Sequence, residues 1–133
     1  MITTVCMNPS FDKTASVDTL ATGGLNRLRD VRVDVGGKGV NVAVVLKRLG
    51  VPVSCVGCLG ERGRESFLQM IRQEGVPFDY LPMPGEVRTN LKLLDNSTRA
   101  ITEFNEPGIS MDSAQLEDFL TLLGAVSYTH LRA

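Results

Sequence analysis

The chain has 133 residues, of which 43% are hydrophobic and 22% charged, a composition typical of one globular unit with a buried core. Its 14 Lys and Arg nearly balance its 15 Asp and Glu, and the net charge of -1 argues against general attraction to nucleic acid or a membrane surface. The first residues lack the pattern of a secretory signal, and no apolar stretch reaches the ~20 residues of a membrane span. We expect a cytoplasmic protein with neither a nucleic-acid nor a membrane partner.

Along the first half of the chain, apolar runs of strand length give way to a segment of helical period. Residues 2–7 predict a strand that ends at the turn-forming pair Asn8 and Pro9. Two short segments that alternate apolar and polar residues, 15–17 and 31–35, are typical of strands with one wet face. From Lys38 the period becomes helical, and Gly50 ends the helix. The apolar residues that follow the i, i+3, i+4, i+7 pattern, and are expected to face inward, are Val42, Val45, Leu46 and Leu49.

The second half of the chain continues this alternation of strands and helices. The predicted elements are a buried strand at 53–59, a helix at 64–74, a β-hairpin of 89–94 and 99–104, and a helix at 112–123. In the last helix, Asp112 and Gln115 have the spacing of an N-cap and its reciprocal partner. This order predicts an α/β fold: a partly parallel sheet covered by helices, with short strands that need not belong to it.

Cysteine and histidine supply no metal centre in this sequence. Three cysteines, an odd number, argue against a closed disulfide framework. Cys55 and Cys58 have a metal-like or redox-like spacing, but they lie within a β-rich run, and no second pair follows. The only histidine, His130, is too isolated to complete a zinc site. We expect the cysteines to be small buried hydrophobic residues.

A glycine-rich corner joins the strand at 31–35 to the helix that begins at Lys38. It contains Gly36, Gly37 and Gly39, with Lys38 and Asn41 beside them. The free N–H groups and the positive end of the dipole at a helix N-terminus favour an anion or an oxygen-rich ligand. The spacing matches neither the Walker loop nor the GxGxxG fingerprint. The alternative interpretation is a merely tight turn, but the lysine and asparagine favour ligand binding.

Three further polar residues are candidates for the same site. Asp12 follows the first strand at its carboxyl end, where open α/β sheets bind ligands, and its carboxylate can accept two sugar hydroxyls. Arg88 precedes the hairpin and can bind a phosphate bidentately. Arg27 is a weaker candidate of the same kind, as is Arg29. Each residue alone is more common as a turn residue or a solvated arginine.

Four segments, "NPSFD", "GGKGVNVAVVLKRLG", "RTNLKLLD" and "TEFNEPG", occur in an order and spacing that resemble the PfkB (ribokinase-like) carbohydrate kinases, in particular the bacterial 1-phosphofructokinases. The resemblance covers residues 1–124. It implies the N-terminal part of a three-layer α/β/α core with a small β-lid, formed by residues of about 13–35 and 89–104. In this family the lid covers the sugar and often builds a dimer interface, which implies a homodimer.

The resemblance also implies roles for the candidate residues. Asp12 would hold sugar hydroxyls, while Gly37, Lys38 and Asn41 would line the sugar site. Arg88, and less strongly Arg27, would bind the phosphate already on the substrate.

The implied reaction transfers the γ-phosphoryl group of ATP, with Mg²⁺, to the 6-hydroxyl of fructose 1-phosphate, giving fructose 1,6-bisphosphate. Three alternatives stay open: a tagatose-6-phosphate kinase, a ribose or nucleoside kinase, and a non-catalytic module that binds a sugar phosphate or mediates an interaction.

Two features depart from the family pattern. Complete members carry a GAGD-like loop with the catalytic aspartate, and most of the ATP site, in their C-terminal half. This sequence contains no GxGD, so no catalytic residue and no metal ligand is assigned, and the fragment is expected to be inactive. The segment 125–133 resembles peptide encoded by synthetic adapter DNA more than a continued helix, so we expect it to lie outside the family domain.

Overall fold

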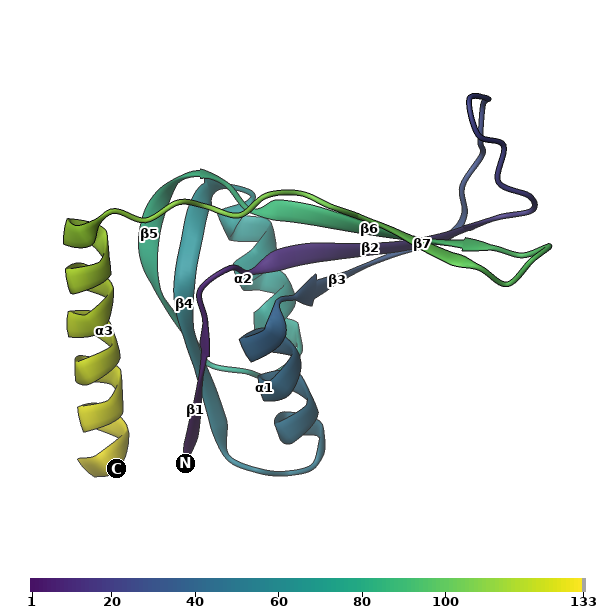
Figure 1. Ribbon diagram of the computed structural model, residues 1–133. Helices are drawn as coiled ribbons and strands as arrows, with labels where there is room; N and C mark the ends of the chain where they lie inside the picture. Colours follow the sequence, from purple (N-terminus) through teal and green to yellow (C-terminus); the bar gives the residue numbers. More distant parts are fainter. Residues whose placement is uncertain (133) are drawn as a thin grey trace.

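The molecule contains two separate sheets (Figure 1). A computed structural model describes the backbone of residues 1–132 and the side chains of residues 1–129. The elements are β1 (Ile2–Cys6), β2 (Ser10–Val17), β3 (Arg29–Gly36), α1 (Lys38–Arg48), β4 (Val53–Arg62), α2 (Arg64–Gln73), β5 (Phe78–Glu86), β6 (Arg88–Asp95), β7 (Ile101–Asn105) and α3 (Ser113–Arg132). The core sheet is parallel, in the order β1-β4-β5. The lid sheet, in the order β3-β2-β6-β7, projects from its side.

Helices cover both faces of the core sheet, which confirms the predicted three-layer α/β/α architecture. Alternate side chains of β4 point to opposite faces, as the pleat requires. Cys55 and Leu59 belong to the cluster under α1 and α2, whereas Val56 and Cys58 pack towards α3. Because β4 is covered on both sides, it forms the continuous apolar run that the sequence predicted to be a buried strand.

The strand β5 is absent from the sequence-based prediction. It contains Pro82 and Pro84, which cannot donate a backbone hydrogen bond and therefore argue against a strand. The structure resolves the conflict because β5 lies at the edge of the core sheet, where one side of the strand needs no partner. The predicted hairpin is confirmed as the antiparallel pair β6 and β7, and it belongs to the lid sheet.

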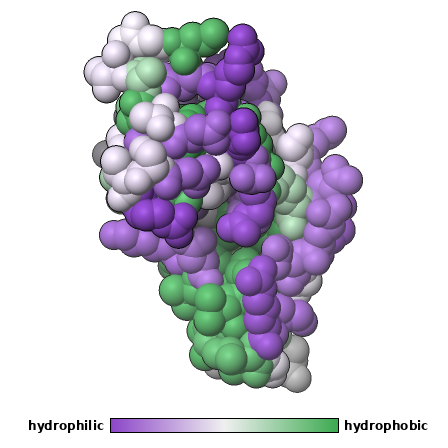
Figure 2. Space-filling model, turned by 90° about the vertical axis from the view of Figure 1, so that its right-hand side faces the viewer, coloured by the Kyte–Doolittle hydropathy of each residue, from purple (hydrophilic) through white to green (hydrophobic). Residues whose placement is uncertain are grey.

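Helix α1 faces the core sheet with a different side from the predicted one. The buried residues are Gly39, Val40 and Ala43, while Val42, Val45 and Leu49 are 50%, 54% and 72% exposed. Leu46 packs partly against the core. The reason is that Gly39 lies directly against the backbone of Val5 in β1, so the small residues of α1 face the sheet. Figure 2 shows a hydrophobic area at the lower end of the molecule, seen from the right-hand side of Figure 1.

Helix α3 begins as predicted and continues beyond its predicted end. Asp112 Oδ1 accepts from the N–H of Gln115 at 2.7 Å, and Gln115 Oε1 accepts from the N–H of Asp112 at 2.9 Å, which confirms the reciprocal cap. The expected end at Leu123 is wrong, because Val126, seven residues after Phe119, continues the buried stripe and is only 7% exposed. The final residue, Ala133, lies outside the described residues.

All three cysteines are buried and unpaired, as expected for small apolar residues. Burial raises the pKa of Cys55 to about 12 and that of Cys58 to about 11, which keeps both thiols protonated at neutral pH. Among residues 1–129, no helix combines the length and apolarity needed to cross a membrane.

The turn between β6 and β7 is organised by Asp95, and its acid sensitivity is a testable property. Hydrogen bonds from the hydroxyl of Ser97, from the N–H of Leu20 after β2, and from the N–H groups of Ser97 and Thr98 in the turn lower the pKa of Asp95 from 3.8 to about 2. A depressed pKa stabilises the fold at pH values above the unfolded pKa, and this stabilisation is lost as the pH falls through the folded pKa. We expect Asp95→Asn to lower the melting temperature at neutral pH, and the difference from wild type to shrink between about pH 4 and pH 2. A difference that stays constant over this range would contradict the assignment.

Candidate functional site

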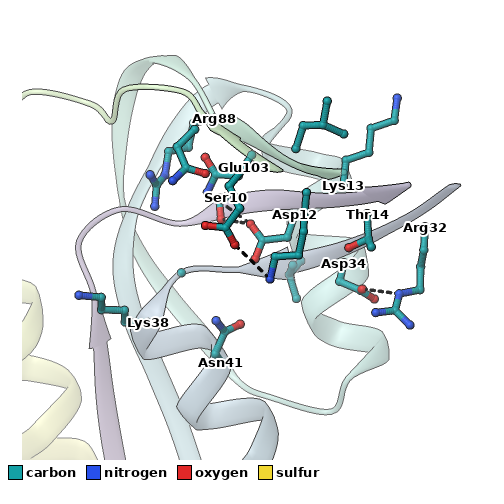
Figure 3. A pocket seen from close by; sticks show the side chains of 16 residues that line it. Ser10, Asp12, Lys13, Thr14, Arg32, Asp34, Lys38, Asn41, Arg88 and Glu103 are labelled. Atoms are coloured by element: carbon teal, nitrogen blue, oxygen red, sulfur yellow. Dashed lines mark hydrogen bonds and ion pairs between the residues drawn. The ribbon is translucent and has the colours of Figure 1, made fainter. Parts of the chain in front are cut away.

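One face of the lid sheet carries rows of polar side chains that cross all four strands. The pairing register aligns Asp34, Asp12, Asn90 and Asn105 in one row, and Arg32, Thr14, Lys92 and Glu103 in the next. The two rows are two residues apart along each strand, so all eight side chains point to the same face. Figure 3 shows this face above the start of α1.

A pocket of about 560 Å³ lies between this polar face and the start of α1 (Figure 3). This volume is within the range of small-molecule sites. Five of the six predicted site residues line the pocket: Asp12, Gly37, Lys38, Asn41 and Arg88. The structure therefore brings together residues from β2, α1 and β6 that lie up to 76 positions apart (88 minus 12).

The carboxylate of Asp12 is held on one side only. Its Oδ1 accepts hydrogen bonds from the hydroxyl of Ser10 at 2.8 Å and from Asn90 Nδ2 at 3.4 Å. Within the described residues, no hydrogen bond to Oδ2 is formed. A Cβ at Gly36 would overlap this carboxylate, so only glycine leaves room for it. Oδ2 lies against the backbone of Gly36 and keeps its capacity to accept a hydrogen bond, so Asp12 has one anchored oxygen and one oxygen with no hydrogen-bond partner among the described residues.

Arg88 at the start of β6 and Lys38 at the start of α1 both line the pocket. Neither has a carboxylate partner among the described residues. Arg88 Nη2 donates to the carbonyl of Asn8 at 3.2 Å, which orients the guanidinium, and its buried Nε forms no hydrogen bond within the described residues. Arginine has five N–H donors in a planar fork, so most of this guanidinium stays unpaired. Lys38 is exposed at the first turn of α1. The two side chains therefore provide positive charge for an anionic ligand.

The remaining cations on the polar face are already neutralised. Arg32 Nε lies 2.8 Å from Asp34 Oδ2, and Lys92 Nζ lies 3.5 Å from Glu103 Oε1. Within the described part of the chain, Arg88 and Lys38 near α1 are therefore unpaired, as is Lys13 of β2, which also lines the pocket, whereas Arg32 and Lys92 further along the lid are paired with carboxylates.

The start of α1 adds backbone donors to the cationic end. Gly37 is the N-cap, with φ 105° and ψ 147°, a conformation that favours glycine, and no side chain caps the helix. The N–H of Asn41 bonds to the carbonyl of Gly37 at 2.8 Å, so the first intrahelical bond begins there. The earlier N–H groups of the first turn have no intrahelical partner, and they lie at the positive end of the helix dipole.

Arg27, the weaker candidate for the phosphate, does not line this pocket. It lies in the exposed loop between β2 and β3, whereas the pocket lies where β2 begins and β3 ends. The strand β2 spans Ser10 to Val17, roughly 23 Å at about 3.3 Å per residue, and this length separates the loop from the pocket.

Sequence reasoning missed Ser10, Asn90 and the carboxylates of Asp34 and Glu103, all of which line the pocket. Strand alternation offered a signal for two of them, because Ser10 shares a face with Asp12, and Asn90 shares a face with Arg88. Among the described residues, no cluster of three or more His, Cys, Asp or Glu side chains could hold a metal ion.

Comparison with known families and sequences agrees with this geometry. Residues 5–133 match the model of the pfkB family of carbohydrate kinases. A 1-phosphofructokinase of Vibrio cholerae is 36% identical over 129 residues, which are 97% of this chain and 40% of the relative. The 1-phosphofructokinase of Escherichia coli K12 is 31% identical over 120 residues, 90% of this chain and 38% of that protein. The chain thus spans about 40% of the length of the curated relatives it matches.

Solved structures show the same fold. A possible 1-phosphofructokinase of Thermotoga maritima superposes with a TM-score of 0.82 at 28% identity, covering 91% of this chain and 39% of that one. The phosphofructokinase-2 of Escherichia coli in complex with fructose 6-phosphate superposes with a TM-score of 0.82 at 22% identity, covering 89% of this chain and 39% of that one. The family match, the fold and the arrangement of the glycine-rich corner agree, and the chain belongs to the pfkB family of carbohydrate kinases.

Proposed function

We propose that this chain forms the sugar-phosphate-binding part of a kinase that transfers the γ-phosphoryl group of ATP to the 6-hydroxyl of fructose 1-phosphate. The observation that carries the proposal is the polarity of the pocket. The unpaired cations Arg88 and Lys38 lie at one end, and the carboxylate of Asp12, with its second oxygen left to accept a hydrogen bond, lines the same 560 Å³. Relatives named 1-phosphofructokinase support this choice of substrate.

Each side chain has a binding task in this proposal. The guanidinium of Arg88 and the ammonium of Lys38 bind the phosphate of the substrate, since charge-assisted hydrogen bonds to phosphate are the strong ones. Asp12 accepts hydrogen bonds from sugar hydroxyls and so orients the ring. In this proposal the lid sheet covers the ligand and excludes water, which would otherwise compete as phosphoryl acceptor.

ATP is the proposed donor, and Mg²⁺ would neutralise charge on its phosphates. No cluster of metal-ligating side chains is present among the described residues, so no step is assigned to the metal here. The residues of this chain bind and orient the acceptor.

Titration calorimetry of the chain with fructose 1-phosphate, tagatose 6-phosphate, fructose 6-phosphate and fructose tests the proposal. We expect fructose 1-phosphate to bind most tightly and neutral fructose at least tenfold more weakly, because only the phosphate engages the free cations. Phosphorylation of the same sugars by the product of the full-length gene tests catalysis. Preference for tagatose 6-phosphate would instead indicate a tagatose-6-phosphate kinase. Binding of fructose as tight as that of fructose 1-phosphate would overturn phosphate recognition.

We also propose that two copies of the chain associate through the face of the lid opposite the pocket. Strand pairing places Val33, Lys13, Leu91 and Phe104 in one row across the sheet, so three of its four residues are apolar, and Val33 and Phe104 are 43% and 54% exposed. An exposed apolar sheet face is a typical association surface. Analytical ultracentrifugation of the wild type should show a dimer, and Phe104→Glu should shift it towards the monomer. A wild-type monomer at high concentration would exclude this association.

A further inference from the structure

We propose that Asn90 is a positioning residue, which orients the carboxylate of Asp12 so that Oδ2 faces the ligand. The identity of the ligand as a sugar phosphate rests on the function proposed above. The orientation of the side chain rests on the hydrogen bonds of the lid sheet alone.

The pairing of β2 with β6 places the two residues side by side. Asp12 and Asn90 are direct register partners of the parallel pair, and their side chains point to the same face. Asn90 Nδ2 lies 3.4 Å from Asp12 Oδ1, and both residues line the pocket. Hydrogen bonds in unliganded sites are often long and shorten when the ligand binds.

The other end of the Asn90 amide is occupied by a donor. The backbone N–H of Glu106 donates to Asn90 Oδ1 at 3.2 Å. If the amide turned over, its NH₂ group would face this N–H, and its carbonyl oxygen would face the carboxylate of Asp12. Both contacts would be repulsive, so the two neighbours together select one orientation of the amide.

Glu106 is in turn fixed to β6. Its Oε1 accepts a hydrogen bond from the backbone N–H of Thr89 at 2.6 Å. Asn90 is therefore bound by the backbone N–H of a residue whose side chain bonds back to Thr89, the neighbour of Asn90 on the same strand. This closed arrangement immobilises the amide before any ligand arrives, which lowers the entropic cost of orienting Asp12.

Asn90 and the buried Ser10 both donate to Oδ1 of Asp12. These two hydrogen bonds determine which carboxylate oxygen remains available to a ligand. With Oδ1 occupied twice, the carboxylate presents Oδ2 as the acceptor that is left. A single hydroxyl donor would leave the carboxylate free to rotate about its terminal bond, because this torsion is broad for aspartate.

The first test compares the binding of fructose 1-phosphate by Asn90→Asp and by the matched control Asn96→Asp. Asn96 lies in the exposed turn between β6 and β7, so its variant carries the same change of charge away from the pocket. We expect Asn90→Asp to bind at least tenfold more weakly at about pH 7.5, and the control to bind within about twofold of wild type. Melting temperatures of both variants report whether the fold is retained. Wild-type affinity of Asn90→Asp would overturn the proposal.

The pH profile separates positioning from a structural defect. In Asn90→Asp two carboxylates face each other, so one of them holds a proton at a higher pH than usual and can then donate to the other. The charged groups that line the pocket around this pair are Lys13 on β2, Arg32 and Asp34 on β3, Lys38 on α1, Arg88 and Lys92 on β6 and Glu103 on β7, and Glu106 follows β7 beside Asn90. We expect the ratio of variant to wild-type affinity to recover several-fold from about pH 7.5 to 5.5. A ratio that is independent of pH would contradict the proposal.

A ligand-free measurement distinguishes failure of this inference from failure of the proposed function. The side-chain amide NMR signals of Asn90 should shift when Asp12 is replaced by Asn, and should stay in place in the surface variant Asp18→Asn. Unchanged signals in Asp12→Asn would overturn the positioning role. Absence of fructose 1-phosphate binding by the wild type, with the amide shift present, would overturn the proposed function and leave the positioning of Asp12 supported.

Discussion

Replacing Arg88 with alanine is expected to weaken the binding of fructose 1-phosphate roughly 10- to 150-fold, which corresponds to about 1.5–3 kcal/mol for a lost charge-assisted hydrogen bond. The reason is that Arg88 lines the pocket with most of its guanidinium unpaired, while Arg32 and Lys92 are neutralised by carboxylates. Arg88→Lys should give an intermediate affinity, because lysine keeps the charge and loses the planar fork. Titration calorimetry measures all three proteins.

A matched control separates this effect from a general loss of positive charge. Arg72 is exposed near the end of α2 and does not line the pocket, so Arg72→Ala should bind fructose 1-phosphate like wild type. Neutral fructose should bind wild type and Arg88→Ala equally. If Arg88→Ala retains wild-type affinity for fructose 1-phosphate, the phosphate does not bind at this end of the pocket.

Replacing Gly39 with alanine is expected to destabilise the chain by about 3 kcal/mol, at the upper end of the usual cost of overpacking. A Cβ at this position would overlap the carbonyl group of Val5 and lie 2.9 Å from the backbone nitrogen of Cys6. These atoms belong to β1, which is paired with β4 and cannot move alone. Helix α1 must therefore shift away from the sheet, and it carries Lys38 and Asn41 with it.

Thermal unfolding measures this effect, which should appear as a fall in melting temperature of roughly 10 °C. Gly124→Ala is the matched control, because Gly124 lies within α3 and an added Cβ would meet no atom within 4 Å. Alanine is the better helix former, so the control should be neutral or more stable by up to about 1 kcal/mol. Equal melting temperatures for Gly39→Ala and wild type would show that α1 does not need this close approach.

Much of the local structure could be predicted because neighbouring residues encode it. The reciprocal cap of Asp112 and Gln115, the hairpin and the position of the glycine-rich corner each depend on a few consecutive residues. The same reasoning failed where local patterns compete with tertiary contacts. Pro82 and Pro84 argue against a strand until the edge position of β5 is known, and α1 turned a different face inward because Gly39 packs against Val5.

The sequence by itself determined the α/β class, the helix that starts at Lys38 and the chemistry of the residues available for a phosphorylated ligand. Only the tertiary structure decided which of these residues lie together in one pocket. The parallel pairing of β2 with β6 places Asn90 beside Asp12 and leaves Arg27 at the far end of the lid. This pairing joins residues 78 positions apart in the sequence (90 minus 12), and its stability comes from backbone hydrogen bonds and packing across the sheet. No periodicity within a single strand encodes the identity of its neighbour, so the composition of the site follows from the assembled sheet.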